Sequence, residues 1–493
     1  MVNASASIQI QTLESRMLLS AGALDPSYSS VYDGRRMSVA FSPQIHPQLD
    51  GKILHCAYIG PTNASIQFWR TNPNGSLDKT FGSHGVINLR DTSPGATEVT
   101  DFEVQSDGKF VALVLIHAKG LQLRRFNANG RPDRSFGRGG KVGLATRDGA
   151  NFGEIAIQND GKILVVGNDI SKGYIRRFNA NGSVDTSFAT RGTKTILPQN
   201  EAGWVGMGGI DIRRSDNRIV FAYSYHLGSD YSLAELQVLS PNGDLEWNYE
   251  GAPMSNEYSS IGTVMVDGDG SIVVSGNAKY FDASGDYGYH NYIIRHPAQK
   301  STAGLIWSTQ SEDFSGSLVP QGDGRILTTL GSRIARLNYN LTPDSSFASG
   351  GTFDTGWYSL AVALQGDGKI VADGGQFVSR HNPHSDFHSL RLIGDGPFVV
   401  ASKQTVKVSG TSGNDQINIS QSHGIISVTL NGLDPFLFSA KKIKGLAIDA
   451  GDGNDTIIVS AALPIAIVDG GNGDDTFSGK RKDDQVISVE HLT

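Results

Sequence analysis

Three glycine- and aspartate-rich segments near the C-terminus carry the most specific chemistry in this 493-residue sequence. They are GTSGNDQIN (410–418), AGDGNDTII (450–458) and GGNGDDTFS (470–478). Glycine lets the backbone of a turn approach an ion, and each aspartate adds carboxylate oxygens. Ca²⁺ is a hard cation that takes about six to eight oxygen ligands. These residue types, grouped in this way, predict a calcium site.

The three segments resemble the GGxGxDxUx nonapeptide of RTX-type calcium-binding repeats. The segment at 470 matches fully, whereas Thr411 and Ala450 each replace a glycine. The resemblance implies that the aspartates bind calcium and that the apolar residue two positions further on points into a stack of coils. The ligands that it implies are Asp415, Asp452, Asp455, Asp474 and Asp475.

The spacing of the segments departs from that resemblance, because the nonapeptides of a β-roll follow one another without a gap. Here they start at residues 410, 450 and 470. The last two lie about one full coil apart, so they could still stack and share an ion. Calcium binding and the glycine-rich turns of a metal-free β-solenoid both fit this region.

Aromatic side chains beside Asp and Asn form a second group with potential chemistry. They concentrate in residues 197–206, 224–232, 252–260 and 277–291. Exposed rings suit sugar or peptide surfaces, but the same rings could pack these segments onto neighbouring strands. The predicted ligand-binding residues are Trp204, Tyr225, His226, Tyr231, Tyr258, Tyr287, Tyr289 and His290.

The sequence lacks the common catalytic signatures. It has no GxSxG elbow, no HExxH, no Walker sequence and no cysteine pairs for zinc. No catalytic residues are predicted.

A repeat positions the aromatic group. Its clearest copy is QNDGKILVVGNDISKGYIRRFNANGSVDTSF (158–188), which places a DG pair and an NG pair between apolar runs. A DG pair between two strands is typical of a two-residue type I′ hairpin, in which both central residues have positive φ. The unit therefore predicts strand, DG turn, strand, loop, strand, NG turn, connecting segment and strand.

The DG element recurs along most of the chain. It begins at residues 50, 107, 160, 269, 323 and 367, and Asp216-Asn217 is a degenerate copy. Units of about fifty residues with four strands have the size of one propeller blade. Seven copies predict an all-β, seven-bladed β-propeller.

The pattern QxDGKI…RxNxNGxLDxSFG resembles the bacterial delta-60 repeat family over about residues 24–390. Copies four and five depart from it most. Asp216-Asn217 replaces the DG pair, and RHPAQKSTAG (295–304) lacks the NG turn.

The two ends of the repeat array complement each other. The seventh copy supplies SLAVALQ, KIVADG and QFVSRHN as its first three strands, and LDPSYSSVYDG (24–34) matches the missing remainder. An N-terminal strand that completes the last blade would close the ring and remove two exposed sheet edges.

Charge and composition narrow the class of protein. The net charge of −7 argues against a nucleic-acid partner, which requires a basic stripe. The single cysteine, Cys56, lies in an apolar run and is expected to be a small buried residue. No apolar run is long enough to span a membrane.

The predicted organisation is a leader (1–23), the propeller (24–393) and a small β-roll or β-solenoid-like domain (394–493). Within the leader, LESRMLLSAGA resembles the LEPR-type N-terminal motif of exported planctomycete proteins, with Ser15 in place of proline. We therefore expect a secreted or cell-surface, monomeric, non-enzymatic binding or adhesion protein whose partner is an extracellular glycan or protein. The alternative is an extracellular propeller hydrolase or lyase that acts on polysaccharide. Acidic residues and one histidine that converge at the channel mouth with shifted pKa values would favour it.

Overall fold

The computed structural model describes most of the chain between residues 21 and 493. The described residues are 21–30, 35–37, 43–48, 50–59, 65–89, 97–116, 120–144, 153–168, 172–197, 204–226, 232–250, 259–281, 287–298, 305–309, 315–377, 385–394, 398–402, 404–411, 413–422, 424–432, 435–460, 463–479 and 482–493. Among them the only helical element is the 3-10 turn η1 (Ala440–Lys442), and no helix has the length and hydrophobicity of a membrane span.

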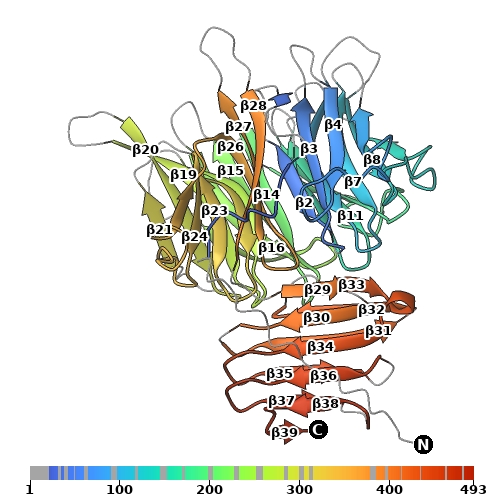
Figure 1. Cartoon of the computed structure of the whole chain (residues 1–493). Helices are drawn as coiled ribbons and strands as arrows, with labels where there is room; N and C mark the ends of the chain where they lie inside the picture. Colours follow the sequence, from blue (N-terminus) through green and yellow to red (C-terminus); the bar gives the residue numbers. More distant parts are fainter. Residues whose placement is uncertain are drawn as a thin grey trace, which may run out of the picture.

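Seven antiparallel four-stranded blades form the N-terminal domain, as the repeats predict (Figure 1). Blade 1 contains β2 (Gln44–Pro47), β3 (Ile53–Ile59), β4 (Ser65–Thr71) and β5 (Val86–Leu89). Blade 2 contains β6 (Thr97–Val104), β7 (Phe110–Ile116), β8 (Gly120–Phe126) and β9 (Lys141–Gly143). Blade 3 contains β10 (Ile155–Ile157), β11 (Ile163–Asn168), β12 (Gly173–Phe178) and β13 (Thr193–Ile196).

The remaining blades follow the same order. Blade 4 contains β14 (Trp204–Arg213), β15 (Arg218–His226), β16 (Ser232–Leu239) and β17 (Leu245–Glu250). Blade 5 contains β18 (Ser259–Val266), β19 (Ile272–Phe281), β20 (Tyr287–His296) and β21 (Leu305–Thr309). Blade 6 contains β22 (Ser315–Pro320), β23 (Ile326–Leu330), β24 (Arg333–Leu337) and β25 (Thr352–Asp354). Blade 7 contains β26 (Tyr358–Leu364), β27 (Ile370–Phe377), β28 (Ser385–Leu392) and the N-terminal β1 (Arg35–Met37).

The ring is closed by the N-terminal segment. The first strand of each blade contacts the first strand of the next, from β2 through β6, β10, β14, β18, β22 and β26 back to β2. In blade 7, β1 pairs antiparallel with β28, and the N–H of Asp25 donates to the carbonyl of Arg391 (2.8 Å). The predicted closure is therefore confirmed, although the strand itself begins at Arg35, just beyond residues 24–34.

The third strand of blade 7 was placed too early by the sequence. QFVSRHN was expected to form it, but Gln376 and Phe377 end β27, and the third strand is β28. The register identifies Arg391 as the arginine that matches Arg125 and Arg177 of the inner repeats, because it pairs with Val371 next to the DG turn. More residues separate β27 from β28 than separate β11 from β12, so the local pattern did not predict where β28 begins.

The DG turns are not type I′ hairpins. In the third copy, the N–H of Gly161 donates to the carbonyl of Gln158 and the N–H of Gln158 donates to the carbonyl of Lys162. Gly161 has a φ of 79°, whereas Asp160 is not among the residues with positive φ. This is a three-residue loop in which glycine takes the left-handed position after a type I turn. Asp160 instead accepts the N–H of Lys162 on its carboxylate.

Each repeated arginine and aspartate form a buried unit that we call the arginine–aspartate module. Arginine Nε donates to aspartate Oδ2 at 2.8–2.9 Å in five copies, which are Arg70–Asp78, Arg125–Asp133, Arg177–Asp185, Arg336–Asp344 and Arg391–Asp25. The guanidinium also lies over an aromatic ring of the same copy, as Arg177 does over Phe188 (4.7 Å). Arg70 donates onward to the carbonyl of Ala128 in the next blade. Arg125, Arg177 and Arg391 make the same kind of bond, so in four copies the module ties a blade both to itself and to its neighbour.

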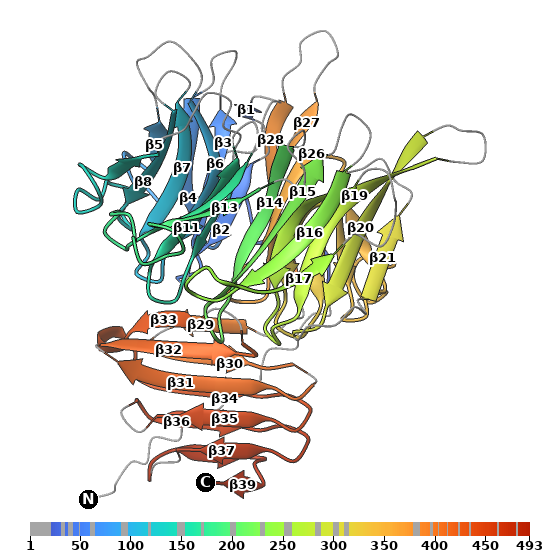
Figure 2. The same ribbon diagram turned by 180° about the vertical axis from the view of Figure 1, so that it is seen from behind.

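The C-terminal module, residues 398–493, is a stack of coils with two sheets (Figure 2). One sheet has the order β29 (Phe398–Ser402), β30 (Thr405–Ser409), β34 (Gly445–Asp449), β36 (Ala466–Asp469) and β38 (Gln485–Ile487). The other has the order β33 (Phe436–Ser439), β32 (Ile425–Leu430), β31 (Gln416–Ser422), β35 (Thr456–Val459), β37 (Thr476–Ser478) and β39 (His491–Leu492). The hairpin of β32 and β33 explains the longer offset between the segments at 410 and 450, because β31 and β35 still pair in parallel.

The C-terminal module packs against the DG-turn face of the ring (Figures 1 and 2). The N–H of Val399 donates to the carbonyl of Gly366 in the β26–β27 turn (2.6 Å). Gly268 in the β18–β19 turn lies so close to the β32–β33 turn that a Cβ would sit 2.0 Å from the carbonyl oxygen of Asn431. The opposite face of the ring is therefore the one that the C-terminal module leaves open.

Candidate functional site

Two carboxylates at the innermost strands of neighbouring blades each point toward the next blade. Asp101 lies on β6, and Glu154 directly precedes β10. Asp101 Oδ2 accepts the N–H of Ile155 (2.7 Å), and Glu154 Oε2 accepts the N–H of Ile210 (3.1 Å). Each carboxylate thus satisfies a backbone group of the next blade, which gives it a structural role.

The environment of these two carboxylates favours their protonated forms. Burial raises the pKa of Glu154 to about 8, and the charges of Asp101 and Asp211 add to the effect. Burial also raises the pKa of Asp101 to about 6, although the N–H groups of Ile155 and Phe102 oppose the shift. Asp211 on β14 accepts the N–H of Val266 (2.7 Å) and completes the acidic group.

A carboxylic acid that keeps its proton near neutral pH can act as a general acid. The imidazole of His46 on β2 packs 4.7 Å from the ring of Phe102, and burial lowers its pKa to about 4. The sequence patterns did not predict these acidic residues or His46 as functional. A signal was present, because Asp101 and Glu154 both stand four residues before the Gln of the QxDGK pattern, where the other copies carry uncharged residues.

Three predicted calcium ligands form a ladder along the C-terminal module. The N–H of Asp415 donates to Asp455 Oδ1 (2.7 Å), and the N–H of Asp455 donates to Asp475 Oδ1 (2.8 Å). The three residues are buried, with at most 1% exposed. Ile417, Ile457 and Phe477, two positions further on, have 0% exposure, as the nonapeptide resemblance implies.

Whether an ion fits between the coils depends on the hydrogen bonds of Oδ2, the second oxygen of each ladder carboxylate. Asp415 Oδ2 accepts the N–H (2.7 Å) and the hydroxyl (2.9 Å) of Thr411. Glycine stands at this position in the next two coils and has no hydroxyl. Among the described residues, Asp455 Oδ2 and Asp475 Oδ2 have no hydrogen-bond partner although both are buried. Two unpaired carboxylate oxygens fit a cation, whereas Asp415 is already satisfied.

The other two predicted ligands lie on the surface. Asp452 accepts the side-chain amide of Asn472 (2.7 Å), and Asp474 Oδ1 lies 2.7 Å from His491 Nε2. In the part of the chain that the structure describes, no three acidic, histidine or cysteine side chains gather closely enough to hold a metal ion by themselves. An ion between the coils would therefore need backbone carbonyl oxygens or water as further ligands.

The structure describes only some of the predicted aromatic residues and histidines in full. Tyr225 is 7% exposed and lies in the hydrophobic core, where its hydroxyl is 3.0 Å from that of Tyr223. For this residue the packing interpretation holds. Tyr231 and Tyr258 lie outside the described residues. The backbone positions of the others are in strands β14, β15 and β20, and these are Trp204, His226, Tyr287, Tyr289 and His290.

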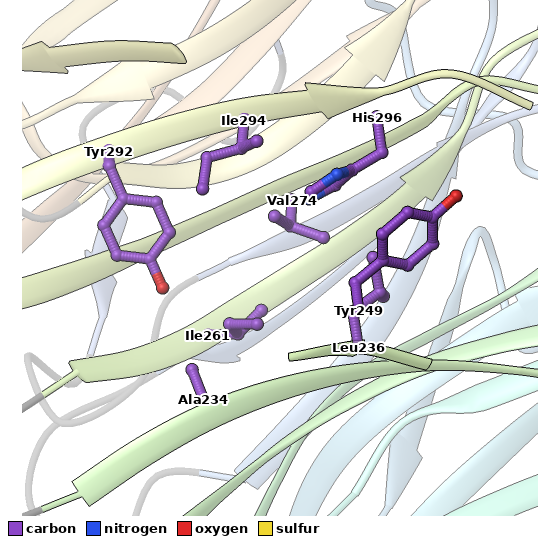
Figure 3. Close-up of a pocket in the computed structure, with 8 residues that line it drawn as sticks. All are labelled: Ala234, Leu236, Tyr249, Ile261, Val274, Tyr292, Ile294 and His296. Carbon is purple, nitrogen blue, oxygen red and sulfur yellow. The ribbon is translucent and has the colours of Figure 1, made fainter. Parts of the chain in front are cut away.

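A cavity between blades 4 and 5 is too small for a ligand (Figure 3). Its volume is about 10 Å³, which is room for a single water molecule. Tyr249 and His296 lie together at one end, with ring centroids 4.5 Å apart, and Tyr292 and aliphatic side chains line the rest (Figure 3). We interpret it as a packing gap.

The sequence profile of a β-propeller domain of unknown function (DUF5122) matches residues 158–188. None of the curated proteins matches the chain. Similar solved structures include an α-L-arabinofuranosidase from Fusarium graminearum, with 12% identity, coverage of 76% of this chain and 97% of that one, and a TM-score of 0.38. A polysaccharide lyase that acts on ulvan has 10% identity, coverage of 75% and 96%, and a TM-score of 0.42. A Bacteroides caccae protein of unknown function has 13% identity, coverage of 58% and 91%, and a TM-score of 0.34.

Proposed function

We propose that this chain is a secreted or cell-surface binding protein that engages an extracellular glycan or protein through the ring face opposite the C-terminal module. The observation that carries the proposal is the contact of the C-terminal module with the DG-turn face, at Gly366 and Gly268. The opposite face remains open to a partner, and it is the face at which β15 ends at His226 and β20 begins at Tyr287, where the sequence concentrates aromatic residues. The delta-60-like repeats supply the scaffold, and the leader supports export.

Binding of the full chain to an array of extracellular polysaccharides and proteins tests this role. Replacing Tyr287 and Tyr289 with alanine should weaken binding at least about tenfold, because aromatic residues commonly dominate such contacts. Lys162→Ala on the DG-turn face is the matched control and should bind like the wild type. A loss of binding confined to Lys162→Ala would place the site on the DG-turn face and contradict the proposal.

We also propose that calcium stabilises the C-terminal module through Asp455 and Asp475. Their unpaired oxygens are the support for this assignment. Bound calcium would add a positive charge between stacked carboxylates, and millimolar extracellular calcium would fill even weak sites of about 10⁻⁴–10⁻³ M. The resemblance to RTX-type repeats points to the same ion.

A second candidate function is hydrolysis or elimination on a polysaccharide at the innermost strands of blades 2 and 3. The raised pKa values of Glu154 and Asp101 favour it, because one protonated and one ionised carboxyl group suit acid–base chemistry. Release of reducing or unsaturated ends from a polysaccharide panel is the measurement. Activity that disappears in Glu154→Gln would support this candidate, and a panel without any product would remove it.

A further inference from the structure

The outer edges of blades 2 and 3 carry an unusual number of cationic side chains. In blade 2 they come from the connecting segment and β9, and in blade 3 from β12, the turn after Phe188 and β13. We call this set the basic rim, and it comprises Arg131, Arg134, Arg138, Lys141, Arg176, Arg191 and Lys194. The first four and Arg191 are exposed, and the other two are partly buried.

Within the described ranges, no acidic side chain neutralises the charges of the basic rim. Among the described residues, none of the seven side chains forms an ion pair, whereas the neighbouring Arg125 and Arg177 are paired with Asp133 and Asp185. The aspartates of this region are therefore already used by the arginine–aspartate modules. The basic rim is free to attract an anion from outside.

The same segment is less basic in other repeats, and in blade 1 it keeps one exposed lysine, Lys79. In blade 4 the corresponding residues include the exposed Asp244 and Glu246, and in blade 6 they include Asp354. The whole chain has a net charge of −7, so the positive charge is local to two blades. A local concentration of one sign on a body of the other sign marks an electrostatic binding surface.

The two blades present these residues side by side. The N–H of Gly137 donates to the carbonyl of Asn181, so the outer turn of blade 2 rests on the NG turn of blade 3 (2.8 Å). A Cβ on Gly182 would touch Phe136 and Val142 of blade 2. Both blades lie on the same side of the ring (Figure 2). The basic rim is thus a continuous surface.

We infer that the basic rim binds an acidic polysaccharide through its carboxylate or sulfate groups. Guanidinium groups bind such anions by paired hydrogen bonds. Single strands of nucleic acid are usually held by exposed aromatic rings as well, but Phe136, the aromatic residue between Arg131 and Lys141, is 0% exposed. The basic rim is separate from the open ring face, so this inference is independent of the proposed function.

Binding of the full chain to alginate and dextran sulfate tests the inference, with neutral dextran and duplex DNA as further probes. The test variant is Arg134→Glu/Arg138→Glu/Lys141→Glu, and all three side chains are exposed. The control variant is Arg333→Glu/Lys441→Glu/Lys442→Glu, which changes the net charge equally at exposed sites elsewhere. Melting temperatures establish that both variants fold, and a glutamine version of the test variant replaces it if it does not.

We expect salt-sensitive binding to the acidic polysaccharides and none to dextran. The test variant should lose at least about tenfold in affinity, and the control variant no more than about twofold. Equal losses in both variants would show an effect of net charge alone and overturn the inference. Absence of polysaccharide binding, or a preference for DNA over the polysaccharides, would overturn it as well.

Discussion

The propeller and the C-terminal module both bury one aspartate in nearly every repeat, and they treat its charge in opposite ways. In the propeller, burial of Asp133 is outweighed by hydrogen bonds from Ser135 and by the charge of Arg125, which lower its pKa to about 2. In the C-terminal module, burial and the charges of its ladder neighbours raise the pKa of Asp455 to about 6. A propeller repeat thus supplies an arginine beside its buried aspartate, whereas a coil of the C-terminal module places other aspartates beside it.

This difference separates two ways of building a repeat. The arginine–aspartate module of a propeller blade is electrostatically complete, since the aspartate finds arginine, lysine and hydroxyl partners in the same copy. A coil of the C-terminal module places like charges in a row and leaves one oxygen of Asp455 and one of Asp475 unpaired. The propeller should therefore be insensitive to added ions, and the C-terminal module should respond to them.

Removing residues 24–34 should cause the largest loss of propeller stability. Arg391 would lose Asp25 and remain buried without a counter-charge, and β28 would lose the segment that covers its edge. We expect a loss of at least about 3–5 kcal/mol in the free energy of unfolding. Chemical denaturation measures it, with removal of residues 1–20 as the control. Unchanged stability would contradict a closed ring.

Arg177→Met tests a module inside the array. It leaves Asp185 buried with only Lys162 as a cationic partner, and we expect a loss of about 3 kcal/mol. Arg131→Met, at an exposed site without an ion pair, should stay within about 0.5 kcal/mol of the wild type. In Arg177→Met/Asp185→Asn the losses should be less than additive. Additive losses would mean that the two residues act separately.

Calcium should stabilise the C-terminal module and leave the stability of the propeller unchanged. At about one hundred times the dissociation constant, calcium should stabilise it by ~2.7 kcal/mol. Titration calorimetry and scanning calorimetry on the full chain measure both effects. Asp455→Asn/Asp475→Asn should abolish the binding heat, whereas Asp415→Asn should keep it, because Thr411 already occupies Asp415 Oδ2. If the wild type gives no binding heat, the calcium assignment is wrong.

Glu154, like Asp101, departs from this pattern within the propeller because its pKa is raised, and its effect on stability is spread over several pH units. Its pKa rises from 4.5 to about 8 on folding, so the folded state holds a proton that the unfolded state releases. Stability should therefore fall as the pH rises through this interval, by at most about 1.4 kcal/mol per pH unit. Glu154→Gln should flatten the profile, and Glu98→Gln on β6 should not. A wild-type profile that is already flat would show that Glu154 is ionised in the folded protein.

Much of the fold could be read from local patterns. The DG pairs and apolar runs identified seven blades and the closing fragment, because hairpins depend on residues that are close in sequence. The turn type was missed, since DG suits both a two-residue loop and a three-residue loop with glycine in the left-handed position. The third strand of blade 7 was misplaced because its register is set by pairing with β27, not by local composition.

The candidate sites depend more on tertiary structure. By itself the sequence determined the repeats, the glycine turns and the position of each aspartate. Only the structure decided that Thr411 satisfies Asp415 while Asp455 and Asp475 keep an unpaired oxygen, because coils forty and twenty residues apart had to be stacked first. The same holds for Asp101 and Glu154, whose pKa values are set by neighbours from other blades. The net charge of the sequence did not predict the basic rim, because a sum over the chain does not show which charges lie together or which are already paired.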